Sequence, residues 1–304
     1  MPELPEVETI ARGVDKRIRG DRIVQVWFDR HPQPFKTPRS RQVRELAGRT
    51  IVAVHRSGKH IVFELSSSGT TLDAHKPGAH TPAAHEREAL RPSAHEREAL
   101  RSFAQWIVHL GMTGRLLVTT PESPVALHTH ARLTLASGRE LRFVDPRRFG
   151  RLEFRDLRRG AAFGAPGDEP LTIGEREFAA LFRGRRLYIK AALLNQTLLA
   201  GVGNIYADES LFQAGIRPRR RANRVTRAEL DRLRLALREV LTRAIRLGGS
   251  SVSDYVDADG ERGFFQLEHC VYLRTGEPCR RCQTPIRRVV LAGRGTHYCP
   301  KCQR

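Results

Sequence analysis

Four of the five cysteines form two closely spaced pairs near the C-terminus. Cys279 and Cys282 form one pair and Cys299 and Cys302 the other, so the spacing is C-x2-C-x16-C-x2-C. Each pair can offer two sulfurs from one tight turn, and four thiolates complete the tetrahedron that Zn²⁺ prefers. Two local disulfides are the alternative, which cytosolic redox conditions disfavour. The pattern predicts one structural zinc, because four protein ligands leave no open position for catalysis.

The chain opens with MPELPEVET, and removal of Met1 would leave Pro2 with a free secondary amine. An α-amino group titrates near pH ~8, and the positive end of a following helix should lower that pKa. Such an amine can attack a sugar carbon and form an iminium, which acts as an electron sink. Glu3 could then transfer protons. The alternative is an ordinary terminus in which Glu3 only complements the helix dipole.

Two motifs suit contact with phosphate. GVGNIYADE (201–209) places two glycines and an asparagine before a predicted helix, where backbone N–H groups can bind an anion. LAGRGTHY places Arg294 at a hairpin tip flanked by glycines, from which it can reach a groove or a phosphate. A simple turn and a solvated arginine are the alternatives.

Two further motifs could insert side chains into a base stack. DPRRFG (145–150) offers Arg147 and Arg148 beside Phe149, and HLGMTGRL (109–116) offers Met112 between two glycines. Cations next to apolar wedges suit insertion into a stacked duplex. The alternatives are solvated arginines and a buried phenylalanine and methionine.

The charge of the chain points to a polyanionic partner. Over 304 residues, 53 Lys and Arg exceed 33 Asp and Glu, giving a net charge of +20 and a pI near 11.0. Nucleic acid is the leading candidate, although an Arg-rich proteome would explain part of the excess. The sequence has no run of 18 apolar residues and no pattern of a signal peptide, so we expect a cytoplasmic protein.

The first half of the chain predicts a β domain with one leading helix. Leu4, Val7, Ile10, Val14 and Ile18 recur at helical spacing within residues 3–19. Segments of β-branched or partly alternating residues predict strands at 22–28, 50–55, 60–65, 115–120, 130–144 (a hairpin) and 150–156. We therefore expect a sandwich or barrel-like β domain over residues 1–156.

Residues 66–103 interrupt this pattern. AHEREALR occurs at 84–91 and again at 94–101, after a stretch rich in His, Pro and Ala. The histidines raise the possibility of a metal site, but a short tandem copy broken by prolines favours an expanded, mobile surface loop.

The second half of the chain predicts helices. After a linker at 157–170, helical periodicity appears at 171–184, 190–201, 205–215 and 225–249. Thr226 and Glu229 form a capping box at the start of the last and clearest of these. We expect a helical domain at 171–250, followed by a loop and the zinc finger at 251–304.

Taken together, these motifs resemble the formamidopyrimidine-DNA glycosylase (Fpg/MutM) family. MPELPEVET, Lys59 in SGKHIVFEL, HLGMTGRL, DPRRFG, AGVGNIYADE and the four-cysteine finger follow the family order along nearly the whole chain, except residues 66–103. The resemblance implies a multidomain α+β fold, with an N-terminal β-sandwich, a helix–two-turns–helix domain and a zinc-finger hairpin. It also implies a monomeric bifunctional DNA glycosylase and AP lyase of base excision repair, with no membrane association and bacterial nucleoid localisation.

The resemblance also implies roles for individual residues. Pro2 would be the Schiff-base nucleophile and Glu3 its acid/base partner. Lys59 would serve β-elimination and Arg294 δ-elimination, acting on duplex DNA that contains oxidised purines or abasic sites. Met112, Arg147 and Phe149 would fill the gap left by the flipped base. The residues implied to contact the DNA backbone are His109, Lys190 and Asn204, with His128 and Arg186 matched less tightly.

Two other functions remain open from the sequence. An endonuclease VIII-like glycosylase would share the fold and the amine but act on oxidised pyrimidines; Leu4 and PEVET favour the purine branch. A non-catalytic nucleic-acid-binding protein would use the helical domain and the finger alone, against which the N-terminus and Lys59 argue. The family suggests no role for Cys270.

Overall fold

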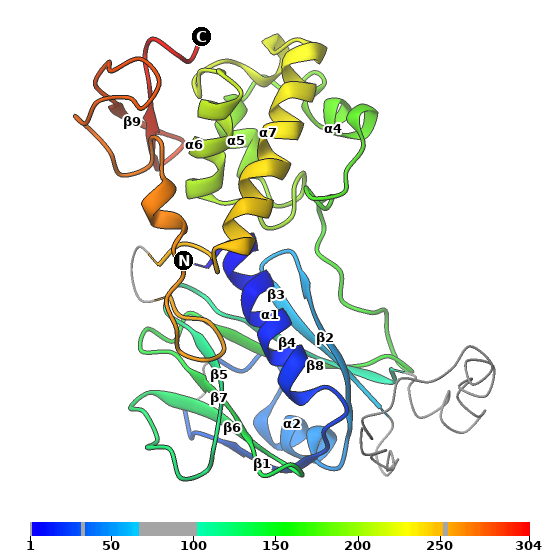
Figure 1. Ribbon diagram of the computed structural model, residues 1–304. Coiled ribbons are helices and arrows are strands. Elements are labelled where there is room, and N and C mark those ends of the chain that lie inside the picture. Colours follow the sequence, from blue (N-terminus) through cyan, green and yellow to red (C-terminus); the bar gives the residue numbers. More distant parts are fainter. Residues whose placement is uncertain (1, 32–33, 67–101, 252–254) are drawn as a thin grey trace, which may run out of the picture. The chain divides into compact units, whose positions relative to one another are not determined.

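The computed structural model describes residues 2–31, 34–66, 102–251 and 255–304 (Figure 1). The chain divides into two compact units, and both are discontinuous in sequence. The helical unit contains residues 1–10, 56–60 and 164–304, and the β unit contains residues 11–55 and 61–163. The division predicted from the sequence was linear and began with a domain at 1–156. The difference arises at Leu4, which is fully buried in the core of the helical unit.

The β unit contains two four-stranded sheets, drawn as separate layers in Figure 1. One sheet has the order β1-β6-β7-β5 and the other β2-β3-β4-β8. Their bounds are Ile23–Phe28 (β1), Ile51–Ser57 (β2), His60–Leu65 (β3), Ala104–His109 (β4), Arg115–Thr119 (β5), Thr129–Leu135 (β6), Glu140–Val144 (β7) and Arg151–Asp156 (β8). All five residues of β7 are buried, as expected of an inner strand. The predicted sandwich with a leading helix, α1 (Leu4–Ile18), is confirmed.

A second helix of the β unit, α2 (Arg39–Leu46), was not predicted. Its buried residues are Leu46 and the polar Gln42, so its sequence shows little apolar periodicity. The Gln42 amide donates to the carbonyl of Thr37 at 2.8 Å and accepts from the indole of Trp106 at 3.0 Å. Long-range hydrogen bonds at a glutamine, rather than an apolar stripe, therefore fix this helix.

The helical unit is built around its longest helix, α7 (Arg227–Arg246). The other elements are α4 (Glu175–Phe182), α5 (Ile189–Leu193), α6 (Asn204–Gln213), the 3-10 turns η2 (Ala222–Arg224) and η3 (Phe265–Glu268), and the strands β9 (Arg287–Leu291) and β10 (Arg294–Tyr298). The predicted capping box of Thr226 and Glu229 is present, and the apolar stripe of α7 is buried.

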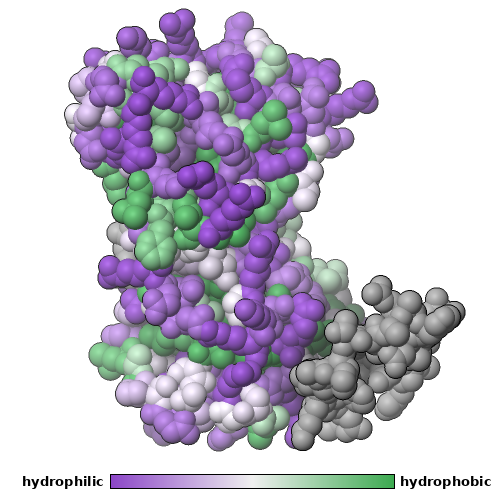
Figure 2. All heavy atoms as spheres, in the orientation of Figure 1, coloured by the Kyte–Doolittle hydropathy of each residue, from purple (hydrophilic) through white to green (hydrophobic). Residues whose placement is uncertain are grey.

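One face of this unit is mostly hydrophilic. On the face shown in Figure 2, hydrophilic side chains cover most of the surface over α7. The exposed residues of α7 include Arg227, Arg232, Arg243 and Arg246. The helix thus separates an apolar inner face from a basic outer face, which suits a protein that works beside a polyanion.

The helix predicted at 190–201 is much shorter in the structure, because α5 ends at Leu193. The side chain of Asn195 accepts hydrogen bonds from the backbone and the hydroxyl of Thr197. The Gln196 amide donates to the carbonyls of Leu194 and Val202. These side chains compete with helical backbone bonds and turn the chain instead.

The segment predicted as a loop at 66–103 lies almost wholly outside the described residues, as do both copies of the repeat. Its two ends lie next to each other, because the Phe103 amide donates to the carbonyl of Leu65 at 2.8 Å. Strands β3 and β4, which flank the segment, are neighbours in one sheet.

Deletion of residues 70–101 is therefore expected to leave catalysis largely intact. A short turn can close the gap between adjacent strands at little entropic cost. The measurement is single-turnover cleavage of a lesion duplex. A loss of about 100-fold in a folded, zinc-loaded variant, the effect of misplacing a catalytic group, would show that the segment belongs to the site.

Candidate active site

Glu3 lies at the N-terminal end of α1, and Pro2 and Glu3 are both buried. The carboxylate of Glu6, one turn into the helix, accepts the backbone N–H of Glu3 at 2.8 Å. This is half of a capping box, and it fixes the backbone that carries Pro2. Glu6 also accepts hydrogen bonds from the hydroxyl of Tyr206 and from the Ser250 amide at 2.8 Å. The Glu6 carboxylate thus fixes the backbone at the start of α1 through hydrogen bonds to Tyr206 and Ser250.

The Glu3 carboxyl has the properties of a group that exchanges protons. Burial raises its pKa to about 7, while Lys59 opposes the rise and Glu6 adds to it. Its Oε1 accepts the Ile205 amide at 3.3 Å, and its buried Oε2 has no hydrogen-bond partner among the described residues. A carboxyl with this pKa populates both protonation states near neutral pH, as a general acid or base requires.

The glycine-rich segment before α6 makes room for this carboxyl. A Cβ atom on Gly203 would lie 2.1 Å from Cδ of Glu3, so a larger residue would displace it. Gly201 adopts a positive φ of 87°, and its carbonyl accepts the Leu4 amide at 3.0 Å. Asn204 begins α6, and its Nδ2 donates to the carbonyl of Gly295 at 3.1 Å. The sequence predicts an anion site at this segment. In the structure its glycines are also required for packing, because they leave space for Glu3 and allow the turn at Gly201.

Lys59 follows the turn residue Gly58, which has a φ of 59°. The pKa of Lys59 is lowered, chiefly by burial, with Glu3 opposing the shift and Arg294 adding to it. The charges of Glu3 and Arg294 both act on Lys59, so the three side chains form one site within the helical unit. A lysine with a lowered pKa is a better proton carrier at neutral pH than a solvated one.

Arg294 is the first residue of β10, directly after the turn of the finger hairpin. The two turn residues, Ala292 and Gly293, have φ angles of 46° and 73°. Positive φ at both central positions is typical of the type I′ turn, whose twist matches the flanking strands. The guanidinium is exposed at the hairpin end, as the sequence predicted.

Lys190 occupies a different place from the one expected. The family resemblance implied a contact with the DNA backbone, yet the Lys190 side chain is fully buried. Its Nζ forms an ion pair with Asp208 at 2.7 Å and donates to the Gly295 carbonyl and the Thr296 hydroxyl, both at 2.9 Å. In this arrangement the ammonium is engaged with protein groups and supports the finger hairpin.

Buried carboxylates on α6 also join the finger to the helical core, and the sequence analysis missed them. Glu209 accepts the amides of Cys270, Val271 and Tyr272 at 2.8–3.0 Å. Burial nevertheless raises the pKa of Glu209. Two adjacent acids within the largely apolar segment 205–212 were the available signal, because a buried carboxylate is rarely found without a partner.

The four predicted cysteines converge. The Sγ atoms of Cys282 and Cys299 lie 3.4 Å apart and those of Cys279 and Cys302 3.9 Å apart, and all four fall within 4.8 Å. Sulfurs about 2.3 Å from a central zinc lie about 3.8 Å from one another, so the cluster fits one tetrahedral Zn²⁺. The predicted structural zinc site is confirmed.

In the β unit, Asp145 organises the two predicted wedge loops. Its buried carboxylate accepts the hydroxyl of Thr113 at 2.6 Å and the amide of Gly150 at 2.8 Å. Gly111 allows close approach, since a Cβ there would lie 2.5 Å from the Phe149 carbonyl carbon. These contacts fix the loops 109–114 and 145–150 against each other.

The side chains that these loops carry are exposed. Met112 is 41% exposed and Phe149 47% exposed, so neither is the core residue of the alternative interpretation. The guanidinium of Arg147 lies over the Phe149 ring, 4.7 Å from its centroid. Insertion between stacked nucleotides requires exposed apolar side chains on loops whose backbone is held in place, and these two loops have both properties.

The remaining predicted contacts lie at loop and strand ends. His109 ends β4, and its Nδ1 accepts the Gly111 amide at 3.1 Å. His128 is exposed at a positive φ of 66°, and its carbonyl accepts the Asp145 amide. Arg186 is exposed, and its carbonyl accepts a hydrogen bond from Arg221.

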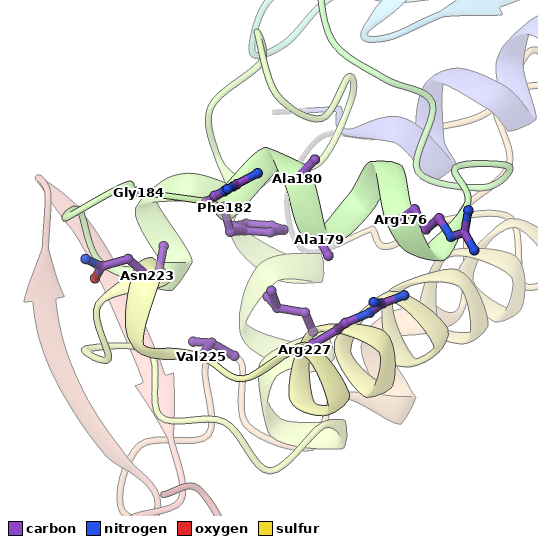
Figure 3. A pocket seen from close by; sticks show the side chains of 11 residues that line it. Arg176, Ala179, Ala180, Phe182, Gly184, Asn223, Val225 and Arg227 are labelled. Carbon is purple, nitrogen blue, oxygen red and sulfur yellow. The ribbon is translucent and has the colours of Figure 1, made fainter.

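A cavity of about 440 Å³ in the helical unit lies apart from these groups. Figure 3 shows Phe182 of α4, Val225 after η2 and Arg227 at the start of α7 around it. None of the predicted site residues is among the described residues that line it.

A buried carboxyl at the N-terminal end of α1 interacts with Lys59, and Lys59 in turn interacts with Arg294 on a hairpin whose four cysteines fit one zinc. This combination is the one expected of an enzyme that processes DNA. Family models match three successive parts of the chain. They are the formamidopyrimidine-DNA glycosylase N-terminal domain at residues 1–152, the corresponding H2TH domain at 167–256, and a zinc finger found in FPG and IleRS at 276–304. The chain belongs to the formamidopyrimidine-DNA glycosylase family.

Similar proteins span the full chain. A formamidopyrimidine-DNA glycosylase of Solibacter usitatus is 42% identical over the whole of both chains. Among solved structures, a Lactococcus lactis FPG mutant bound to Fapy-dG-containing DNA is 32% identical over both chains, with a TM-score of 0.80. Lactococcus lactis Fpg bound to DNA with an abasic site is 33% identical over 99% of both chains (TM-score 0.79). MutM bound to DNA with carbocyclic 8-oxo-G is 32% identical over both chains (TM-score 0.79).

No helix in the described part of the chain is long and apolar enough to cross a membrane.

Proposed function

We propose that this protein removes oxidised purines, including formamidopyrimidines and 8-oxoguanine, from duplex DNA as a bifunctional glycosylase and AP lyase. The observation that carries the proposal is the buried Glu3 carboxyl directly after Pro2, with a pKa of about 7 and one oxygen that has no hydrogen-bond partner in the described part of the chain. The protein would act as a monomer in base excision repair, in the cytoplasm and at the bacterial nucleoid.

Excision begins with the amine that removal of Met1 leaves on Pro2. Its lone pair forms a bond to C1′ of the sugar while the glycosidic bond breaks, and the base departs with the bonding electrons and takes up a proton. Loss of the proton on nitrogen and cleavage of the C1′–O4′ bond give the iminium. The ring oxygen needs a proton at that step, and Glu3, protonated in part at neutral pH, supplies it.

Strand cleavage follows from the iminium. Loss of the C2′ proton breaks the C3′–O bond and releases one phosphate (β-elimination). Loss of the C4′ proton then breaks the C5′–O bond and releases the other (δ-elimination). Lys59 serves the first step and Arg294 the second, because cations stabilise a departing phosphate. Cys279, Cys282, Cys299 and Cys302 would hold a zinc that stabilises the hairpin of Arg294, and four thiolate ligands would leave it no open position for either step.

Extrusion of the damaged nucleotide requires side chains to replace it in the stack. Exposed Met112 and Phe149, with Arg147 stacked on the Phe149 ring, would fill this gap. His109, His128, Arg186 and Asn204 would contact the DNA backbone. Lys190 would act on DNA through the hairpin that it supports.

The test is borohydride trapping of the wild-type protein on matched duplexes that contain 8-oxoguanine, an oxidised pyrimidine or no lesion. We expect the covalent complex to form fastest with the oxidised purine. Preference for the pyrimidine would favour an endonuclease VIII-like enzyme, and no trapping even on an abasic duplex would favour a non-catalytic DNA-binding protein. A variant extended ahead of Pro2, whose amine is an amide, is the negative control.

A further inference from the structure

Behind Arg294 lies a buried ion pair that takes no direct part in the proposed chemistry. Lys190 on α5 and Asp208 on α6 are both fully buried, and their charged groups lie 2.7 Å apart. Burying two charges costs desolvation energy that their attraction often only repays. Such a pair is therefore better explained by what it positions than by stability.

The ammonium of Lys190 holds the strand that carries Arg294. Its Nζ donates to the carbonyl of Gly295 and to the hydroxyl of Thr296. The Thr296 hydroxyl in turn donates to the carbonyl of Arg294 at 3.1 Å. A continuous chain of hydrogen bonds thus runs from the buried ammonium to the backbone of Arg294.

The carboxylate of Asp208 holds the same strand from a second point. Its Oδ2 accepts the backbone amide of His297 at 2.8 Å, while its Oδ1 pairs with Lys190. One carboxylate therefore fixes β10 directly at His297 and indirectly at residues 294–296. The backbone that carries the exposed guanidinium of Arg294 is therefore fixed to α6 both through the His297 amide and through Lys190.

We propose that Asp208 is a positioning residue, which sets the place of the Arg294 guanidinium and thereby the rate of δ-elimination relative to β-elimination. The inference rests on the proposed role of Arg294. With an amide in place of the carboxylate, the buried ammonium loses its counter-charge, and a single oxygen remains where two had served Lys190 and the His297 amide. Strand β10 can then shift along α6 while the finger keeps its zinc.

The experiment measures single-turnover cleavage of an abasic duplex by Asp208→Asn and separates the two products. β-Elimination leaves an unsaturated aldehyde at the 3′ end, and δ-elimination leaves a 3′ phosphate. We expect the second step to slow about tenfold or more, part of the about 100-fold loss that full misplacement of a catalytic group causes, while the first step, the zinc content and the DNA affinity stay near wild type.

Thr296→Val provides a second variant with milder consequences for folding. It keeps the shape of the side chain but removes the hydroxyl between Lys190 and the Arg294 carbonyl, so the product ratio should move in the same direction. Ser210→Ala is the matched control, because among the described residues this buried hydroxyl of α6 bonds only to the Tyr206 carbonyl of its own helix. Its product ratio should equal that of wild type.

Arg294→Ala separates the two ways in which the inference can fail. If this variant still completes δ-elimination, the proposed role of Arg294 is wrong and the inference falls with it. If it loses δ-elimination while Asp208→Asn and Thr296→Val keep the wild-type product ratio, the role of Arg294 stands and the positioning role of Asp208 is overturned. If Asp208→Asn does not fold, the ratio in Thr296→Val decides alone.

Discussion

A Glu3→Gln variant is expected to excise an oxidised purine about 10²- to 10⁴-fold more slowly than the wild-type protein in single turnover, the usual contribution of general acid–base catalysis. The amide preserves the size of the side chain and its bond from the Ile205 amide, but it cannot exchange a proton. The loss should therefore appear in the chemical step, with little change in affinity for lesion DNA.

The pH dependence should change in the same variant. The pKa of Glu3 in the folded protein is about 7, so the wild-type rate should fall as the pH rises through 7 and the acid is lost. The descending limb should be absent in Glu3→Gln, because the amide has no proton to lose. A limb that persists unchanged in the variant would assign the titration to another group.

The pKa of Glu3 also has a consequence for stability. Between its unfolded value of 4.5 and its folded value of about 7, the folded protein holds a proton that the unfolded chain has released. The free energy of unfolding should therefore fall as the pH rises through this window. In Glu3→Gln, the contribution of this residue to the pH-dependent decrease in the free energy of unfolding is absent. If the variant is at least as stable as wild type at pH 8, its lower activity there is not caused by unfolding.

The matched control is Glu8→Gln, an isosteric change in the same helix. The Glu8 carboxylate is bound to Arg56 at 2.7 Å, and neither residue belongs to the proposed chemistry. Its excision rate should stay close to wild type. Equal losses in the two variants would mean that any lost carboxylate in α1 impairs the enzyme, and the acid–base role of Glu3 would be wrong.

Replacing one cysteine of each pair, in Cys279→Ser with Cys299→Ser, should remove the zinc and weaken DNA binding by about 10- to 100-fold. This is the loss expected when one charge-assisted contact, worth about 1.5–3 kcal/mol, is no longer held in place. The apolar cluster of the finger is small, and its cysteines are part of it. Without the metal the hairpin has too little burial to stay folded.

The measurements are zinc content, DNA affinity at fixed salt, and a thermal melt that follows the β unit. The β unit should unfold as in wild type, because it contains none of the four ligands. Cys270→Ser is the control, since this half-buried thiol packs against the finger cluster but is not one of the four. Unchanged DNA affinity in a zinc-free double variant would refute the role of the finger.

Several parts of the site could be predicted from local sequence, for a common physical reason. The cysteine spacing, the turn before Arg294 and the capping box of Thr226 each depend on residues a few positions apart. Over such distances backbone geometry leaves few alternatives, so residue type and spacing determine the structure. The charge of the chain likewise indicated a nucleic-acid partner without any knowledge of the fold.

Tertiary structure decided which polar groups are buried and what they do there. The family resemblance implied that Lys190 contacts the DNA backbone, but its ammonium is bound by the Gly295 carbonyl, 105 residues away, and by Asp208 on the next helix. The start of the chain is held by the Ser250 amide, which binds the Glu6 carboxylate from 244 residues away. Glu3 is buried there, and its burial raises its pKa. Apolar periodicity predicted a helix as far as residue 201, but α5 ends at Leu193. The side chains of Asn195 and Gln196 end it by forming hydrogen bonds within the following turn.

The sequence by itself determined the zinc ligands, the helix caps and the reactive N-terminal motif, because these are properties of neighbouring residues. The tertiary structure alone decided that residues 1–10 belong with the helical unit, that Met112 and Phe149 are exposed, and that Lys190 is buried. Burial depends on every segment that packs around a side chain, and those segments come from distant parts of the chain, where periodicity and spacing carry no information.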